Sequence, residues 1–361
     1  MVSGPKTMGG IVQSAHQNAV PYGKVRKFAA DCVSSGFGAG SALRWRFVMQ
    51  SAALAMVLGA GAPAHAQGDI DAPGPEGPLR GTMILPVSDA PVVLIIPGSG
   101  PTDRDGNSPL GIGAAPYRLL AEGLAEQGIG SVRIDKRGMF GSEGAVPDPD
   151  SVTIADYVRD TGAWVDRVRA RTGASCVWLL GHSEGGLVAL ASAAEVDHLC
   201  GLILVAAPGR PLGAVLKEQL RANPANAPLL GAADQAIDAL SAGRRVDPAT
   251  LPPALAPLFN PALQGFLISA FALDPAELAG NSRLPILILQ GQRDLQVPVG
   301  DAERLKEAAP HATLTILPDT NHVLKQVHSD ERDANLTTYA AADLPLAPGV
   351  VEAITRFVRS Q

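Results

Sequence analysis

The sequence predicts an α/β fold, a doubly wound and mostly parallel β-sheet that carries a helical insertion. Short apolar runs with little polar alternation recur along the chain, as expected for strands that are covered on both faces. Helical patterns separate these runs, and strands that alternate with helices typically form a parallel sheet. A chain of 361 residues with 46% hydrophobic content is long enough to bury the core of such a domain.

The first 66 residues differ in character from the rest of the chain. A basic Arg-Trp-Arg segment at 44–46 precedes an apolar stretch at about 47–61, and an Ala-His-Ala sequence then ends at Ala66. These are the three parts of a secretory signal peptide. We therefore expect a leader over 1–66, cleaved after Ala66, and a periplasmic or secreted domain over 67–361. An uncleaved leader, which would anchor the protein in a membrane, is the alternative.

The charge of the expected mature domain limits its partners. The leader holds six of the 29 basic residues and one of the 35 acidic ones, which leaves 23 against 34 and a formal net charge of −11. An acidic domain of this kind disfavours nucleic acid and anionic membranes as partners. No apolar run beyond the leader is long enough to span a bilayer. We expect no nucleic-acid partner and no stable membrane partner.

The regular elements follow the alternation of apolar and helical patterns. Strands are expected at residues 92–96, 131–134, 177–180, 202–205, 286–289 and 313–317. Helices are expected between them, including residues 117–126, 152–171 and 301–309. Strand and helix alternate in this order through most of the chain, so the sheet should be covered by helices on both faces.

A long interruption rich in Ala, Leu and Pro separates the fourth of these strands from the fifth. Prolines divide it into helical segments, expected at residues 212–222, 232–242, 261–271 and 275–279. Inserted here, residues 211–283 should form a cap over the carboxyl ends of the strands, with apolar side chains that line an acyl pocket. A scaffold excursion remote from any site is the alternative.

The pentapeptide Gly-His-Ser-Glu-Gly at 181–185 directly follows an apolar strand and directly precedes a helical segment of small residues at 186–194. A serine on such a sharp strand-to-helix turn has its hydroxyl exposed at the edge of the sheet, and flanking glycines avoid collisions with the neighbouring strand and helix. This pattern is the nucleophile elbow of serine hydrolases. Ser183 is the expected nucleophile.

A serine nucleophile requires a base and an acid that orients the base. Asp294 and His322 each follow a predicted strand, so the order along the chain is Ser, Asp, His. Asp301 is the alternative acid. His328 is the alternative base, but it follows an apparent helix start at 323–325 that would carry it away from the strand end. The other histidines beyond the leader lie within the turn itself or before a strand.

These motifs resemble the α/β-hydrolase superfamily, and within it the serine aminopeptidase-like and carboxylesterase-like group, over roughly residues 79–358. The resemblance implies the α/β-hydrolase fold, and it assigns the backbone N–H groups of Ser99 and Glu184 as the oxyanion hole. It also implies that no cofactor and no metal is needed. Pro97 stands where many relatives carry His, but the oxyanion contact is made by backbone.

Two charged stretches lie in loops that also look like those of this group. In 103–105 an arginine stands between two carboxylates. This pattern favours charge-assisted bonds that fix the oxyanion loop, and a metal site is the less favoured alternative. The stretch 135–137 is expected to hold a second loop near the site. The role of the Glu184 side chain stays open between bonds to neighbouring loops and contact with a polar substrate group. The stretch 98–100 lacks the spacing of a dinucleotide or phosphate site.

Two cysteines remain once Cys32 has left with the leader. Cys176 and Cys200 each begin what should be neighbouring parallel strands, about 4.8 Å apart. In an oxidising compartment they can form a disulfide. Two free thiols are the alternative, because the side chains can point to opposite faces of the sheet.

The expected function is that of an exported carboxylesterase, which cleaves a small-molecule acyl substrate through an acyl-enzyme intermediate. An aminopeptidase or thioesterase on the same triad and a non-catalytic binding protein are the alternatives. An aminopeptidase needs carboxylates that bind a substrate ammonium, and the expected cap is poor in them. Its acidic residues are Glu218, Asp234, Asp238, Asp247, Asp274 and Glu277.

Overall fold

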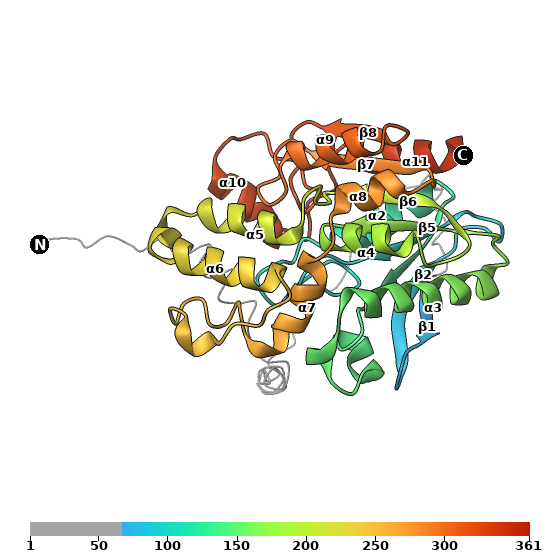
Figure 1. The fold of residues 1–361 in the computed structure, drawn as a ribbon. Helices are drawn as coiled ribbons and strands as arrows, with labels where there is room; N and C mark the ends of the chain where they lie inside the picture. The colour runs from blue at the N-terminus through green and yellow to red at the C-terminus, as the bar shows by residue number, and fades with distance from the viewer. Residues whose placement is uncertain (1–66) are drawn as a thin grey trace, which may run out of the picture.

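In the computed structural model, residues 67–361 are described, and they form an eight-stranded sheet with helices on both faces (Figure 1). The expected leader over 1–66, with its apolar stretch and cleavage site, lies outside the described residues. The strand order is β1-β2-β4-β3-β5-β6-β7-β8. The bounds are β1 Gln67–Pro73, β2 Pro78–Ile84, β3 Val92–Ile96, β4 Gly130–Ile134, β5 Val177–His182, β6 Leu199–Val205, β7 Ile286–Gly291 and β8 Thr313–Leu317.

The six strands expected from the apolar runs are confirmed as β3 to β8, which are parallel to one another. β1 and β2 were not predicted. They extend the sheet at one edge as an antiparallel pair, and β2 is also antiparallel to β4. β1 is exposed at most of its positions, so this edge lacks the continuous apolar signal that marks strands covered on both faces.

Alternate residues of the central strands enter two separate cores. In β3, Leu94 packs into one hydrophobic cluster and Val93 and Ile95 into the other. In β5, Leu179 and Leu180 divide in the same way. Because successive side chains of a strand point to opposite faces, the sheet is buried on both sides. This arrangement confirms the doubly wound fold.

The helices divide between these two faces. The first core includes side chains of α3 (Ile154–Thr172), α4 (Glu184–Ser192) and α9 (Val299–Ala308). The second includes those of α2 (Pro116–Glu126) and α11 (Val350–Ser360). α11 was not predicted, and its buried residues cover the second face beside α2. The site described below lies where the carboxyl ends of the parallel strands meet these layers.

Four α-helices lie between β6 and β7, where the cap was expected. They are α5 Leu212–Arg221, α6 Leu230–Ser241, α7 Pro261–Phe271 and α8 Pro275–Asn281, with short 3₁₀ turns η4 Pro224–Leu229 and η5 Pro248–Thr250. Proline opens α7 and α8, where its missing N–H costs no helical hydrogen bond. Figure 1 shows α5, α6 and α7 gathered beside one end of the sheet.

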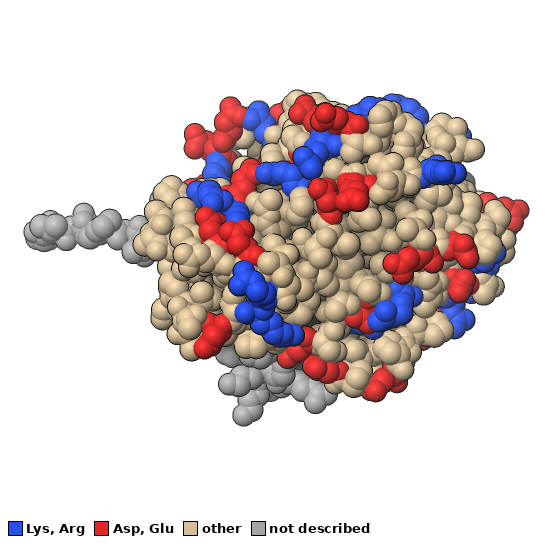
Figure 2. All heavy atoms as spheres, in the orientation of Figure 1, with Lys and Arg blue, Asp and Glu red and all other residues tan. Residues whose placement is uncertain are grey.

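Ion pairs hold the first two helices of this insertion together. Lys217 and Arg221 of α5 each lie 2.5 Å from a carboxylate of α6, Asp238 and Asp234 respectively. Figure 2 shows basic and acidic side chains interspersed over this face of the molecule. Among residues 67–361, no helix is both long and apolar enough to cross a bilayer.

The helix expected to begin at 323–325 is not present, and this prediction was wrong. Leu324 has a φ of 61°, which is incompatible with a right-handed helix. The segment folds into a tight loop, in which the N–H of Asn321 donates to the carbonyl of Lys325. The carbonyl of Leu324 accepts the N–H of Ala347, which lies later in the chain. The next helices are α10 Arg332–Thr337 and the 3₁₀ turn η6 Thr338–Ala340.

Cys176 and Cys200 are joined by a disulfide, with their Cα atoms 5.2 Å apart. Cys176 immediately precedes β5, and Cys200 lies in the neighbouring strand β6. Of the two alternatives left open by the sequence, the structure has the disulfide.

Candidate active site

Ser183 lies at the turn between β5 and α4, with φ 55° and ψ −123°. A positive φ is strained for a residue other than glycine, and such strain is found where a side chain must be held in one direction. The two flanking glycines permit the turn. A Cβ at Gly181 would come within 2.1 Å of the carbonyl oxygen of Gly185, and one at Gly185 within 2.3 Å of that of Ile96.

His322 and Asp294 form a hydrogen-bonded pair. The Nδ1 atom of His322 lies 2.8 Å from Oδ2 of Asp294, and both side chains are buried. The other carboxylate oxygen accepts the backbone N–H groups of Gln296 and Val297, at 2.7 and 2.9 Å. The loop after β7 therefore fixes the carboxylate. Since a carboxylate accepts, Nδ1 donates, and Nε2 keeps its lone pair.

Ser183 and His322 line one cavity of about 80 Å³, together with Gly98 and Ser99. Among residues 67–361, Ser183 Oγ has no hydrogen-bond partner. In enzymes without bound substrate, hydrogen bonds between nucleophile and base are often long and tighten only in the complex. The structure thus brings Ser183 to the same cavity as the His322–Asp294 pair.

The two alternative residues lie elsewhere. Asp301 is buried and accepts hydrogen bonds from the guanidinium of Arg210 at 3.0 and 2.6 Å and from the N–H of Gly209. His328 is exposed, with its ring 3.3 Å from Asp319. Neither lines the cavity beside Ser183.

The backbone N–H groups of Ser99 and Glu184 have no acceptor among the described residues. Glu184 directly follows Ser183, and Ser99 lines the same cavity. The loop that carries Ser99 packs against the serine, since a Cβ added at Gly98 would lie 3.2 Å from Cβ of Ser183. Two unpaired donors beside a serine hydroxyl are what an oxyanion hole requires.

His182 is a second buried histidine in contact with this site. Its ring centroid lies 4.8 Å from that of His322. Burial and the neighbouring His322 lower the pKa of His182 to about 3, so the ring is neutral. Its Nε2 atom lies 2.8 Å from the backbone carbonyl of His322. A carbonyl only accepts, so Nε2 carries the hydrogen and cannot serve as a base toward Ser183.

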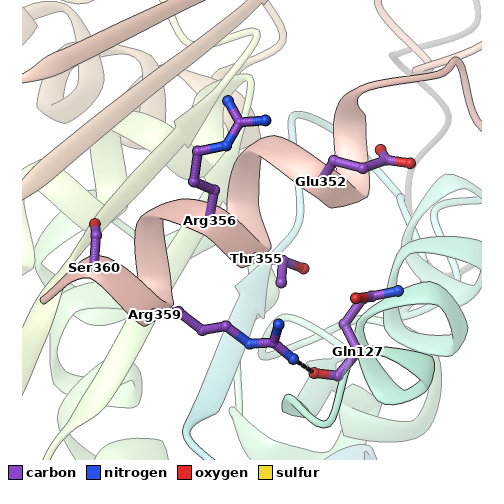
Figure 3. A pocket seen from close by; sticks show the side chains of 6 residues that line it. All are labelled: Gln127, Glu352, Thr355, Arg356, Arg359 and Ser360. Atoms are coloured by element: carbon purple, nitrogen blue, oxygen red, sulfur yellow. Dashed lines mark hydrogen bonds between the residues drawn. The ribbon is translucent and has the colours of Figure 1, made fainter.

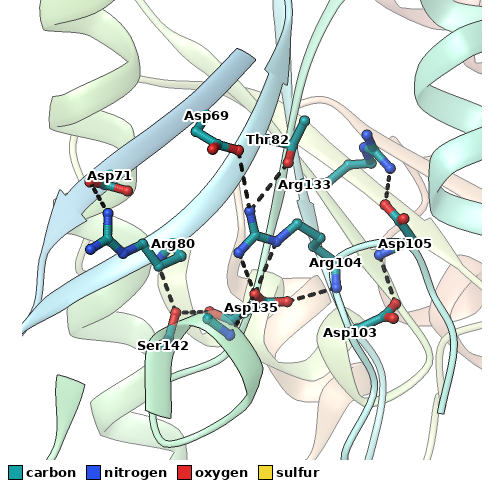
Figure 4. A network of polar contacts seen from close by, with 11 residues as sticks. Asp69, Asp71, Arg80, Thr82, Asp103, Arg104, Asp105, Arg133, Asp135 and Ser142 are labelled. Atoms are coloured by element: carbon teal, nitrogen blue, oxygen red, sulfur yellow. Dashed lines mark hydrogen bonds and ion pairs between the residues drawn. The ribbon is translucent and has the colours of Figure 1, made fainter. Parts of the chain in front are cut away.

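The charged stretch 103–105 makes charge-assisted bonds, as expected, and its partners lie in other segments of the chain. Arg104 does not pair with its two neighbours in sequence. Its guanidinium bonds Asp135, at 2.9 and 2.5 Å, as Figure 4 shows. Asp103 accepts backbone N–H groups of its own loop, and Asp105 pairs with Arg133. Within residues 67–361, no group of three His, Cys, Asp or Glu side chains could hold a metal ion.

The stretch 135–137 connects three elements around the site. Asp135 holds the Arg104 loop, and Arg137 bonds Asp160 of α3 at 2.7 and 2.6 Å. Lys136 points toward Gly98. The expectation that this stretch holds a loop near the site agrees with these bonds. The particular partner of Lys136, Gly98, and the place of Tyr117 in the cavity lining were not predicted.

The lining of the cavity differs from the expectation in one respect. Its residues are Gly98, Ser99, Thr102, Gly106, Ile112, Pro116, Tyr117, His182, Ser183, Gln296, His322 and Val323. None of them belongs to 211–283, so the apolar cap side chains expected to line an acyl pocket do not line this cavity. The insertion instead contacts its rim, where Gln219 of α5 donates a 3.1 Å hydrogen bond to the carbonyl of Gln296.

A second hollow, of about 410 Å³, lies between the end of α2 and α11 (Figure 3). Arg359 bridges its two sides through a 2.6 Å bond to the carbonyl of Gln127. Its lining combines arginine, glutamate and hydroxyl side chains without a histidine or cysteine.

The fold and the site define a protein with a serine on a strand-to-helix turn of a parallel sheet, in one cavity with a histidine that is hydrogen-bonded to an aspartate. Residues 92–334 match the alpha/beta hydrolase family, and the chain belongs to that family. It is 30% identical over 253 residues to Esterase EstD of Thermotoga maritima, an alignment that covers 68% of this chain and 58% of that protein. The chain thus spans less than two thirds of the length of this relative.

Solved structures are similar in fold. The esterase Pf2001 of Pyrococcus furiosus is 17% identical, with a TM-score of 0.52 over 84% of this chain and 95% of that one. Est1E from Butyrivibrio proteoclasticus is 19% identical, with a TM-score of 0.49 over 81% and 98%. The likeness to Pf2001 supports the fold.

Proposed function

We propose that this protein is a carboxylesterase that acts on small acyl esters. Ser183 Oγ attacks the acyl carbonyl while Nε2 of His322 takes its proton. The proton then goes to the leaving alkoxide, and the acyl group stays on Ser183 until water, activated by the same histidine, releases it. Asp294 orients the imidazole and stabilises its protonated form. The N–H groups of Ser99 and Glu184 bind the oxyanion of each tetrahedral intermediate.

One observation carries this proposal. His322, held by its 2.8 Å bond to Asp294, lines the same cavity as Ser183 and Ser99, and the N–H of Ser99 has no acceptor among residues 67–361. These groups supply a nucleophile, a base, an orienting acid and an oxyanion donor in one place. The name of the relative, an esterase, points to the same chemistry.

The cavity favours an ester over an aminoacyl amide. None of its described lining residues is a carboxylate that would bind a substrate ammonium. Four of the six acidic side chains of the insertion are in ion pairs with arginine or lysine, namely Glu218, Asp234, Asp238 and Asp274. An aminopeptidase would have to break these pairs or recruit a carboxylate from farther away.

The test is labelling with a fluorophosphonate probe, together with turnover of p-nitrophenyl butyrate and of alanine p-nitroanilide. We expect labelling and ester turnover, both abolished in Ser183→Ala, and slow or absent anilide turnover. Anilide rates that match the ester rates and depend on Ser183 would favour the aminopeptidase. No labelling and no turnover by the folded wild type would favour a binding protein.

We also propose that the protein is exported and cleaved after Ala66. The described residues Gln67–Pro73 form strand β1, which pairs with β2 from Gln67 opposite Ile84, so cleavage after Ala66 would keep every described strand of the sheet. The Cys176–Cys200 disulfide is consistent with an oxidising compartment. The expected result is a mature N-terminus at Gln67 in the periplasm or medium. A purified protein whose N-terminus lies upstream of Arg44 would refute it.

A further inference from the structure

Lys136 is the only lysine or arginine side chain in the described residues that contacts both segments carrying the oxyanion donors. It lies just after β4, and only 4% of its side chain is exposed. Its Nζ atom donates a 2.7 Å hydrogen bond to the carbonyl oxygen of Gly98 and lies 3.4 Å from Oε1 of Glu184. The ring of Tyr157 covers the ammonium, with its centroid 5.4 Å away.

The bond to Gly98 acts on a particular peptide unit. The carbonyl of Gly98 and the N–H of Ser99 belong to the same amide, and the described chain contains no cis peptide bond. In a trans amide these two groups point in opposite directions. A cation that holds the carbonyl on one side therefore directs the Ser99 N–H to the other side, where Ser99 lines the cavity beside Ser183.

The bond also changes the strength of the donor. A charged donor on the carbonyl withdraws electron density from the amide, and hydrogen bonds in such a chain strengthen one another in a buried setting. The same ammonium holds the side chain of Glu184, whose own N–H is the second donor. A single buried cation is thus bonded to both segments that carry the oxyanion hole.

We propose that Lys136 is a positioning residue of the oxyanion hole, a proposal that rests on the proposed function. It fixes the orientation of the Gly98–Ser99 amide and increases the polarity of the Ser99 N–H, without itself touching the substrate. Its contribution should be largest when negative charge develops on the substrate oxygen, which is the condition for raising turnover and not merely binding. The burial that lowers the pKa of Lys136 is partly offset by Glu184, which favours the charged form.

The test variant must not leave a buried charge alone, because Lys136→Met by itself would leave the Glu184 carboxylate unpaired. We therefore choose the double variant Lys136→Met/Glu184→Gln, in which both charges are removed and the side-chain volumes are kept. A second double variant, Lys136→Gln/Glu184→Gln, retains a neutral N–H donor at position 136. Lys306→Met is the control, since its Nζ also donates to backbone carbonyls, those of Pro310 and Ala312, but outside the site.

Three quantities are measured on the full chain: kcat and KM for p-nitrophenyl butyrate, and the inhibition constant of an alkyl trifluoromethyl ketone, whose adduct with serine carries an oxyanion. For the Met/Gln variant we expect kcat to fall about 10- to 100-fold with KM within about threefold, below the loss for removing a donor outright. The ketone should bind more weakly by a similar factor. The Gln/Gln variant should recover part of kcat and part of the affinity for the ketone. Lys306→Met should match the wild type in both.

The outcomes separate this proposal from the proposed function. A wild type that neither reacts with the probe nor hydrolyses esters contradicts the proposed function. An active wild type and a folded Met/Gln variant with unchanged kcat and ketone affinity contradict the role of Lys136. The role of Lys136 is also contradicted if kcat and ketone affinity fall in the Met/Gln variant and neither recovers in the Gln/Gln variant. Failure of both double variants to fold contradicts it as well, because Lys136 would then be needed for the scaffold.

Discussion

The hydroxyl of Tyr117 lies 2.9 Å from Nδ1 of His182 and connects the loop that carries Gly98 to the loop that carries His322. His182 carries its hydrogen on Nε2, so Nδ1 accepts and the hydroxyl donates. The same hydroxyl accepts the N–H of Gly98 at 3.1 Å. On the other side of the ring, Nε2 donates to the backbone carbonyl of His322. Hydrogen bonds thereby fix the positions of segments that are distant in sequence relative to one another.

This network predicts that Tyr117→Phe destabilises the protein. The ring would keep its packing, but the Gly98 N–H and Nδ1 of His182 would both lose a buried partner. An unsatisfied buried group costs about 1–3 kcal/mol, which urea unfolding can measure. Tyr339→Phe is the control, because it removes only a longer contact of 3.3 Å to Gln296. Equal losses for the two variants would show that the hydroxyl of Tyr117 has no special role.

His182 predicts an acid-dependent loss of stability. Burial lowers its pKa from the ordinary value of 6.5 to about 3, so the unfolded chain takes up a proton at this residue before the folded protein does. The contribution of the neutral His182 to the free energy of unfolding is therefore complete above pH 6.5. It is lost as the pH falls toward 3, by at most about 1.4 kcal/mol per pH unit. Urea unfolding of wild type and His182→Gln should show a smaller pH slope in the variant. Parallel pH profiles would contradict a neutral, buried His182.

The choice of base predicts opposite results for two histidines. His322→Ala should lower kcat by about 10³- to 10⁶-fold, because members of a triad act as a unit. His328→Ala should retain most of the activity, since its side chain is 74% exposed and lies outside the cavity. Circular dichroism of both variants controls for folding. The reverse ranking of the two kcat values would refute the assignment.

The disulfide predicts a thiol count. In protein that begins at Gln67, denatured without reductant, a thiol reagent should find no free thiol, whereas two thiols would refute the pairing of Cys176 with Cys200. The two cysteines are 24 residues apart in sequence. Removing a cross-link of this kind should lower the free energy of unfolding by about 2–4 kcal/mol. The double variant Cys176→Ser/Cys200→Ser measures this loss against the oxidised wild type.

The parts of the fold that could be predicted are those with a local signal. The buried strands are continuous apolar runs, and the turn at Ser183 needs glycines at fixed positions on either side. The residues Asp294 and His322 could be proposed because each follows such a strand. β1 and β2 escaped prediction because they form an edge whose pairing, not its composition, makes it a strand.

The supporting contacts of the site had no such signal. Lys136 lies 38 residues from Gly98, and Tyr117 lies 65 residues from His182, so only the folded chain brings these pairs together. The loop after His322 shows the same limit. Its sequence favours a helix at Leu324, but Leu324 is left-handed and its carbonyl accepts the N–H of Ala347 from a later segment of the chain.

The cavity beside Ser183 predicts which residue limits the acyl chain. Ile112 and Val323 contribute its aliphatic lining, and Ile112 comes from a loop outside the strands and helices. Ile112→Ala should enlarge the cavity and raise kcat/KM for longer acyl chains relative to acetate. Burial of one more methylene is worth about 0.8 kcal/mol, or about fourfold. The measurement compares p-nitrophenyl acetate, butyrate and octanoate, with Leu110→Ala as the control because Leu110 lies two residues away but does not line the cavity. An unchanged chain-length profile in Ile112→Ala would show that Ile112 does not limit the acyl chain.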